Sequence, residues 1–131
     1  MTDRNQIGPC SPFFVVSNIE KALRHYVDVL GFACAYKGPD GDPFFAIVNR
    51  GSAQIMLKFI AEDCRPTPNR QHHEDARWDA FVFVPDPEGL AEEFAGKAVP
   101  FHRPLARDED GLLGFEVADP DGYVCYFGKP G

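Results

Sequence analysis

Residues 13–32, FFVVSNIEKALRHYVDVLGF, contain in order the signals for a strand, a helix start and a helix end. The opening apolar run is short, β-branched and aromatic, which favours a strand over a helix. The polar segment SNIE then offers a capping box and, as an alternative, an asparagine cap. Apolar residues recur beyond it at helical spacing, and Gly31 suits the left-handed position that ends a helix. We therefore predict a strand at 13–16 and a helix at 18–30.

Three further strands are predicted directly after this helix. The sequences GPDG and NRG, rich in residues typical of turns, separate them. The last of the three alternates apolar and polar side chains, as a half-buried strand does. We place these strands at 32–37, 44–48 and 53–60, so the first half of the chain has the order strand, helix, strand, strand, strand.

The same order of elements returns after residue 77. An apolar run at 78–84 predicts a strand, and Asp86-Pro87 is typical of a helix start. We predict this helix at 87–95 and further strands at 99–104, 113–117 and 123–127. An offset of 68 residues superimposes Val16 on Val84, Asn18 on Asp86 and Tyr26 on Phe94. This repetition predicts two related structural units that pack together.

The two halves are separated by a segment of different composition. Residues 61–77 contain two prolines, many charged side chains and no apolar periodicity, which is typical of a long loop. We interpret 1–131 as a single domain, with a first module at 10–60, a loop at 61–77 and a second module at 78–128. His72 and His73 in the loop are candidate metal ligands, but adjacent imidazoles diverge, which favours a solvated pair.

The composition excludes several classes of function. The 131 residues carry a net charge of −7 and show no basic stripe of the kind that binds nucleic acid. No stretch approaches the ~18 apolar residues of a membrane span, and the N-terminus lacks the apolar core of a signal peptide. The four cysteines form no C-x-x-C pair, which argues against a zinc knuckle. We therefore expect a cytoplasmic protein with reduced cysteines, in which Cys34 and Cys125 pack as small hydrophobes.

The first strand of each half is apolar on both of its faces. A strand of this kind is covered on both sides, and the amphipathic helix supplies one cover. The other cover is either a second sheet or a largely apolar cavity for a flat or apolar ligand. The 12 phenylalanines, four tyrosines and one tryptophan favour the cavity, although aromatic side chains also fill ordinary cores.

Two motifs near opposite ends of the chain carry a family resemblance. The first is Val16-Ser17-Asn18-Ile19-Glu20-Lys21-Ala22 with His25-Tyr26 and Val29-Leu30-Gly31-Phe32, and the second is Asp119-Pro120-Asp121-Gly122-Tyr123. Together they resemble the glyoxalase/bleomycin resistance/dioxygenase superfamily, also called the vicinal oxygen chelate superfamily. Asn18, His25 and Tyr123 depart from its usual pattern. The resemblance implies an α+β fold of paired βαβββ modules that form a curved mixed sheet around a cavity, commonly in homodimers.

Enzymes of this superfamily hold a divalent metal with up to four His, Gln or Glu side chains, and the metal stabilises developing charge on the substrate. The motif spacing carries these positions over to Ser11, Met56, Asp79 and Tyr126. Only Asp79 is a good oxygen ligand for such a cation. The resemblance therefore implies the bleomycin-resistance-like branch, whose members bind ligands without a metal, and we predict no cofactor.

We predict a metal-independent protein that binds a small aromatic or cationic molecule, for drug or antibiotic sequestration, as a homodimer. The predicted ligand-binding residues are Ser11 and, facing one cavity by their strand parity, Phe13, Met56, Asp79, Phe81 and Tyr126. The alternative is an enzyme, a glyoxalase-like lyase or a dioxygenase, that holds a divalent metal through unusual ligands such as Asp79. Metal analysis of the purified protein distinguishes the two.

Overall fold

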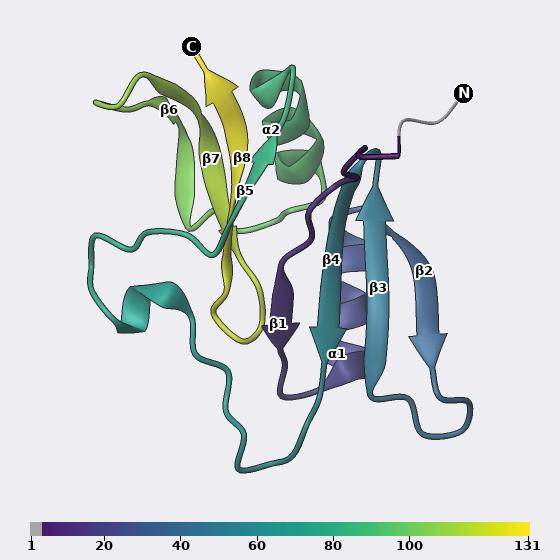
Figure 1. Cartoon of the computed structure of the whole chain (residues 1–131). Helices are drawn as coiled ribbons and strands as arrows, with labels where there is room; N and C mark the ends of the chain where they lie inside the picture. Colours follow the sequence, from purple (N-terminus) through teal and green to yellow (C-terminus); the bar gives the residue numbers. More distant parts are fainter. Residues whose placement is uncertain (1–3) are drawn as a thin grey trace.

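The computed structural model describes residues 4–131, which form two four-stranded sheets (Figure 1). In order across the first sheet lie β1 (Phe13–Val15), β4 (Ala53–Lys58), β3 (Phe45–Arg50) and β2 (Ala33–Gly38). In order across the second sheet lie β5 (Ala80–Phe83), β8 (Val124–Pro130), β7 (Leu112–Ala118) and β6 (Arg103–Arg107). The first pair in each sheet is parallel and the other pairs are antiparallel. The predicted α+β fold of two βαβββ modules is thereby confirmed.

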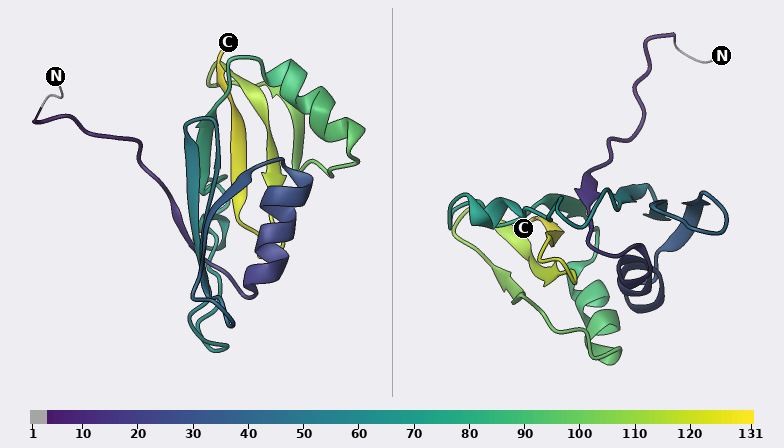
Figure 2. Two further views of the ribbon diagram at one scale, coloured as in Figure 1. Left: turned by 90° about the vertical axis from the view of Figure 1, so that its right-hand side faces the viewer. Right: turned by 90° about the horizontal axis from the view of Figure 1, so that it is seen from below.

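One crossover helix belongs to each module. The first begins as α1 (Ile19–Leu23) and continues as the π-helix η1 (Arg24–Val29), and the second is α2 (Pro87–Gly96). Both helices lie on the same side of the two sheets (Figure 2). Asn18 caps α1 by accepting a hydrogen bond from the backbone N–H of Lys21, whereas the side chain of Ser17 is engaged elsewhere. Within residues 4–131, no helix is long and apolar enough to cross a membrane.

Several predicted boundaries differ from the structure. The helix predicted at 18–30 is largely a π-helix, because the backbone N–H of Leu30 donates to the carbonyl of His25, five residues back. The strand predicted at 99–104 begins only at Arg103, as β6. Ala98 adopts a left-handed backbone with φ 59°, and Val99 donates back to the carbonyl of Phe94, so this segment completes the end of α2.

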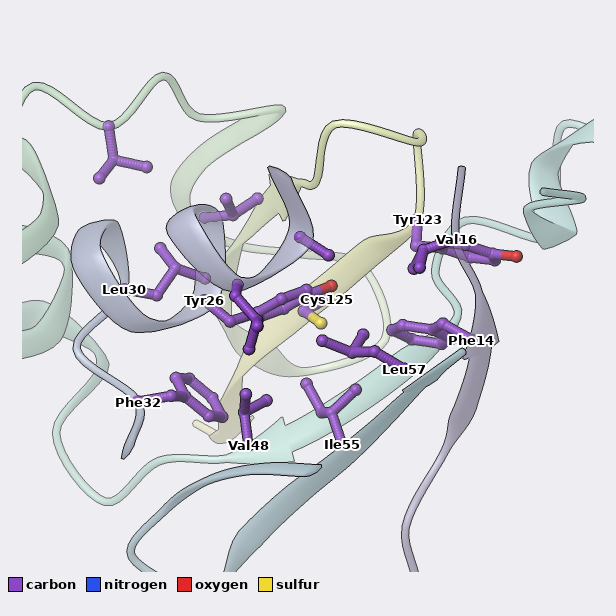
Figure 3. Close-up of a cluster of buried hydrophobic side chains, with 14 of the residues drawn as sticks. Phe14, Val16, Tyr26, Leu30, Phe32, Val48, Ile55, Leu57, Tyr123 and Cys125 are labelled. Atoms are coloured by element: carbon purple, nitrogen blue, oxygen red, sulfur yellow. The ribbon is translucent and has the colours of Figure 1, made fainter. Parts of the chain in front are cut away.

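A single hydrophobic core lies between the helices and both sheets (Figure 3). Tyr26 from the first helix is fully buried in it beside residues of the first sheet, and Cys125 of the second sheet reaches the same cluster. The prediction that Cys125 is a buried hydrophobe is therefore confirmed. The same prediction for Cys34 is wrong, because Cys34 lies exposed on the edge strand β2.

Side chains rather than strand pairing join the two modules. The rings of Phe14 and Tyr123 stack with centroids 4.4 Å apart, and the Tyr123 hydroxyl donates to the carbonyl of Val15 at 2.7 Å. At the far end, Arg50 forms a bidentate ion pair with Glu93 of α2, with both N–O distances at 2.9 Å. These contacts fix the modules beside each other while β1 and β5 remain in separate sheets.

The loop predicted at 61–77 connects the modules and contains the short 3-10 helix η2 (Asn69–Gln71). It leaves the end of β4 and runs beneath the second sheet before it enters β5 (Figure 1). The first three residues, where the chain was predicted to lack a signal peptide, lie outside the described residues. The loop thus passes close to the second sheet, and its residues Asn69 and Arg77 hydrogen-bond to Asp79 and Glu116.

Candidate functional site

Each sheet has one face packed on a helix and an opposite face, here called the open face. Strand register aligns one row of residues across the open face of the first sheet. The row consists of Phe13, Met56, Ile47 and Tyr36. Every member is aromatic or aliphatic, and Phe13 and Tyr36 keep about half of their surface exposed. The first sheet therefore presents a continuous apolar stripe that no element of residues 4–131 buries completely.

The equivalent row on the second sheet changes character from one edge to the other. It consists of Phe81, Tyr126, Glu116 and Arg103, in register. Tyr126 and Glu116 are each only 2% exposed, although they point away from the helix-packed core. One half of this row is aromatic and the other half is charged, so the two modules offer different chemistry from equivalent positions.

The end of the long loop buries the middle of the second row. The Arg77 guanidinium donates to Glu116 at 2.8 Å and lies 3.6 Å from Asp108. The ring of Trp78 lies 4.9 Å from that of Tyr126. The ring of Phe81 stacks on the same Tyr126 ring, with the two centroids 5.0 Å apart. Burial acts to lower the pKa of Arg77, but the hydrogen bond to Glu116 raises it above its ordinary value. Arg77 therefore stays charged above the sheet.

Two glycines fix the position of the Tyr126 ring. A Cβ atom at Gly114 would lie 2.7 Å from the ring, and one at Gly128 would lie 2.5 Å from it. Gly114 lies in β7 and Gly128 in β8, directly opposite each other. Because neither residue has a side chain, the Tyr126 ring can lie over both of them. Burial raises the pKa of Tyr126, which keeps its hydroxyl protonated at neutral pH.

A hollow of about 370 Å³ opens beside this ring and is here called the Tyr126 hollow. The residues that line it include Arg77, Arg103, Arg107, Asp108, Gly114 and Tyr126. A second, more apolar cleft of about 580 Å³ lies between the modules, where Phe81 and Phe83 face Gln54 and the turn after β3. A third hollow of about 400 Å³ lies between β1 and the loop. The open faces thus carry several hollows in place of one deep cavity.

Asp79 has a structural role that its sequence context did not reveal. Its Oδ1 accepts the backbone N–H of Asn69 in the loop at 2.7 Å, and its Oδ2 accepts that of Val124 at 2.8 Å. Both carboxylate oxygens are therefore engaged in holding the loop against β8. Asp79, predicted as a ligand-binding residue, thus has its carboxylate occupied by the protein's own backbone.

The four positions that correspond to family metal ligands do not fit a metal. Both oxygens of Asp79 accept backbone hydrogen bonds, and Ser11 accepts one from the side chain of Gln54 at 3.0 Å. Met56 and Tyr126 supply a thioether and a protonated phenol, which are poor ligands for a hard cation. Within residues 4–131, no group of three or more His, Cys, Asp or Glu side chains is arranged to hold a metal ion.

The structure brings the predicted site residues together only in part. Phe13 pairs with Met56, and Phe81 pairs with Tyr126, on the open faces as their parity predicts. They do not share one cavity, however. Phe13 and Asp79 border the hollow beneath β1, Phe81 borders the inter-module cleft, and Tyr126 borders its own hollow. The two sheets diverge in this single chain, so equal parity on each sheet does not produce a common pocket.

The loop histidines and His25 are not part of the open-face rows. His72 and His73 are exposed, and Nδ1 of His73 accepts the backbone N–H of Asp75 in the same loop at 3.0 Å. His25, expected on the exposed side of its helix, is instead partly buried, and burial lowers its pKa to about 4. The loop histidines therefore agree with the solvated alternative.

Sequence reasoning did not identify the polar residues around Tyr126. Glu116 occupies the polar phase of an alternating strand, which ordinarily marks an exposed side chain. Arg77 belongs to the loop, and Asp108 to a turn between strands, so neither has a periodic signal. Only strand register reveals the equivalence. Tyr126 pairs with Phe81 as Met56 pairs with Phe13, and Glu116 then stands where the first sheet has the apolar Ile47.

Comparison with known proteins agrees with this geometry. Residues 6–127 match the family described as the Glyoxalase/Bleomycin resistance protein/Dioxygenase superfamily, and the chain belongs to this superfamily. No curated protein matches the sequence. Solved structures that resemble the chain include antibiotic-binding proteins, which are described next.

A bleomycin-binding protein from bleomycin-producing Streptomyces verticillus, complexed with copper(II)-bleomycin, is 25% identical, with a TM-score of 0.67 and coverage of 97% of each chain. TnmS3, an antibiotic-binding protein from Streptomyces sp. CB03234, is 16% identical, with a TM-score of 0.71 over 98% of this chain and 100% of that chain. A bleomycin-binding protein complexed with bleomycin is 13% identical, with a TM-score of 0.72 over 94% of this chain and 98% of that chain. The last two likenesses show the shared fold.

Proposed function

We propose that this protein binds a small aromatic molecule on the open faces of its sheets without a metal ion. The observation that carries the proposal is the pair of registered rows, which place Phe13, Met56 and Phe81 on faces that the helices leave uncovered, with the buried ring of Tyr126 beside Phe81. Flat aromatic ligands stack on such side chains. The likeness to bleomycin-binding and antibiotic-binding proteins supports drug or antibiotic sequestration as the role.

The metal-dependent alternative, a glyoxalase-like lyase or a dioxygenase, would need an ion at the four carried-over positions. Engagement of both Asp79 oxygens by backbone N–H groups does not favour it. Ser11 and Asp79 instead border the ligand-binding surface and contribute through the contacts that they already make.

Thermal-shift screening of aromatic compounds, neutral and cationic, tests the proposal. We expect binders whose shift is the same with a chelator and with added divalent metal. Phe81→Ala should weaken them, whereas Ile7→Ala, which removes a 92% exposed side chain ahead of β1, should not. A large stabilisation by metal alone, or equal effects of the two variants, would overturn the proposal.

We also propose that two copies associate through their open faces. Phe13, Tyr36 and Phe83 are 52%, 53% and 73% exposed, and contiguous apolar surface of this kind marks an interface. A homodimer would cover the apolar row of the first sheet and enclose the hollows. Light scattering at micromolar concentration should give twice the chain mass of 14.6 kDa, and a monomeric mass would contradict this proposal.

A reducing, cytoplasmic location completes the proposal. All four cysteines are free, and Cys10 and Cys34 are exposed. Exposed thiols persist in a reducing compartment. Fractionation of the native host with thiol labelling should recover the protein in the cytoplasmic fraction with its cysteines reduced, and recovery outside the cytoplasm would contradict this expectation.

A further inference from the structure

We propose that the Tyr126 hollow recognises a neutral amide edge on the ligand, meaning adjacent C=O and N–H groups. This inference rests on the proposed ligand-binding function and specifies the chemical class of the ligand. It starts from three buried polar atoms that have no hydrogen-bond partner among residues 4–131: Nε of Arg77, Oδ2 of Asp108 and the hydroxyl of Tyr126. All three residues border the same hollow.

The three atoms offer complementary hydrogen-bonding roles. Nε–H of Arg77 is a donor, Oδ2 of Asp108 is an acceptor, and the Tyr126 hydroxyl serves as either. A ligand that presents a carbonyl beside an N–H satisfies the donor and the acceptor together. A primary amide, a cyclic amide or a ureide has this arrangement.

The charges around the hollow disfavour ligands with a full charge. Its lining contains Arg77, Arg103 and Arg107, and also Asp108 with the adjacent Glu109 and Asp110. The three positive and three negative side chains balance, so an anionic or a cationic group is attracted by one set and repelled by the other, and neither recovers the full cost of its desolvation. A neutral group with both a donor and an acceptor avoids both penalties.

Each of the three residues is held by contacts that leave the free atom in place. Oδ1 of Asp108 accepts the backbone N–H groups of Asp110 and Leu112, both at 3.0 Å. Oδ2 lies 3.6 Å from Nη1 of Arg77, which is an ion-pair contact beyond hydrogen-bond distance, so Oδ2 still lacks a hydrogen-bond donor. Nη2 of Arg77 donates to Glu116, which leaves Nε available. Tyr126 is confined by the strand glycines and the stacked rings. A site fixed in this way loses little conformational entropy on binding.

A structural role alone does not explain the Tyr126 hydroxyl. The side chain is 2% exposed, and a phenylalanine ring would fill the same space over Gly114 and Gly128. A buried hydroxyl without a partner destabilises the folded state. The hydroxyl gains a function when a ligand supplies its partner.

Three naphthalene probes that share one ring system test the inference. They are naphthalene-2-carboxamide, 2-naphthoate and naphthalene-2-carboxamidine, which are neutral, anionic and cationic at neutral pH. Titration calorimetry should show the carboxamide binding at least about fivefold more tightly than the other two. Tyr126→Phe should weaken the carboxamide roughly 2- to 10-fold, as the loss of one hydrogen bond predicts.

Ile7→Ala is the control, because Ile7 lies ahead of β1 with a 92% exposed side chain and borders none of the hollows described above. It should leave the affinity unchanged. Tighter binding of the naphthoate or the carboxamidine would overturn the inference. So would equal binding of all three probes with no effect of Tyr126→Phe, although the proposed binding function would then stand. Absence of binding by every probe would also overturn it, and the separate Phe81→Ala screen would decide the function itself.

Discussion

The hydroxyl of Tyr26 donates a 2.8 Å hydrogen bond to Oδ2 of Asp119, and this bond joins the two modules inside the core. Tyr26 belongs to the π-helix of the first module, and Asp119 begins the turn before β8 in the second. Tyr26 is 0% exposed and Asp119 is 6% exposed. The other oxygen of Asp119 accepts the backbone N–H groups of Asp121 and Tyr123, so one carboxylate organises both the turn and the joint.

Tyr26→Phe should therefore destabilise the protein. The change removes the donor and leaves a buried carboxylate oxygen without its partner, which costs about 1–3 kcal/mol. Urea denaturation should show this loss in the free energy of unfolding. Tyr36→Phe, which alters an exposed tyrosine, should change it by less than about 0.5 kcal/mol. A loss no larger than that in Tyr26→Phe would contradict the role of the bond.

The pH dependence of stability should report Asp119. Burial raises its pKa from 3.8 to about 6 in the folded protein. A raised folded pKa contributes stability that is fully present below the unfolded pKa and is lost as pH rises through about 6. The shift of roughly two pKa units corresponds to about 3 kcal/mol. Relative to Asp119→Asn, the wild-type protein should thus lose up to this amount between pH 4 and pH 7.

The comparison with Asp119→Asn isolates this group from His25. Burial lowers the pKa of His25 to about 4, so its stability contribution is lost as pH falls from about 6.5 towards 4. This opposite effect is present in both proteins and cancels in their difference. A difference in unfolding free energy that stays constant from pH 4 to pH 7 would show that Asp119 does not titrate in this range.

Asp79→Ala should loosen the long loop and destabilise the second sheet. The buried N–H of Val124 would lose its acceptor, at a cost of about 1–3 kcal/mol, and the loop would lose its attachment at Asn69. Limited trypsin digestion should cleave faster after Arg70, in the segment that the Asn69 contact holds. Asp75→Asn is the control, because Asp75 is an exposed residue of the same loop. Equal digestion rates for both variants would contradict the attachment.

Tyr126→Phe should leave stability unchanged or raise it by about 1 kcal/mol, because the hydroxyl that it removes is buried without a partner. Tyr123→Phe provides the contrast. The Tyr123 hydroxyl donates to Val15 at 2.7 Å, so its removal should cost about 1–2 kcal/mol. Chemical denaturation measures both values, and a destabilised Tyr126→Phe would reveal a partner for the hydroxyl.

Ala98→Gly should stabilise the protein by about 1 kcal/mol. Ala98 ends α2 with φ 59°, a left-handed conformation that glycine adopts without the steric cost of a Cβ atom. Ala95→Gly, in the last turn of the same helix, should have the opposite sign. Equal melting temperatures for the two variants would contradict this assignment of the helix end.

Local sequence signals predicted the elements whose boundaries depend on local chemistry. The helix predicted at 87–95 is observed at Pro87–Gly96, because Asp86 caps it and proline suits its first turn. The strand predicted at 99–104 is observed four residues later, at Arg103–Arg107, because Val99 is buried against the end of that helix and does not begin a strand. The π-helix escaped prediction because apolar spacing does not distinguish a hydrogen bond over five residues from one over four.

For the candidate site, the sequence predicted which face of a strand each side chain lies on, and no more than that. Parity placed Phe13 and Tyr126 on open faces, since it depends on alternation alone. It could not show that the Asp79 carboxylate is engaged by backbone groups from two distant segments. It also could not show that Arg77 folds over Glu116, because that contact depends on the path of an irregular loop.

Trp78 gives the protein an optical reporter at one defined place. It is the single tryptophan of the chain, and its ring lies 4.9 Å from that of Tyr126 and 5.1 Å from the guanidinium of Arg77. Indole fluorescence depends on nearby charge and polarity, so the tryptophan emission of the protein comes from one place, beside the Tyr126 ring and the Arg77 guanidinium. A fluorescence titration therefore reads events beside Tyr126 without an attached dye, and the first sheet contributes no competing indole signal.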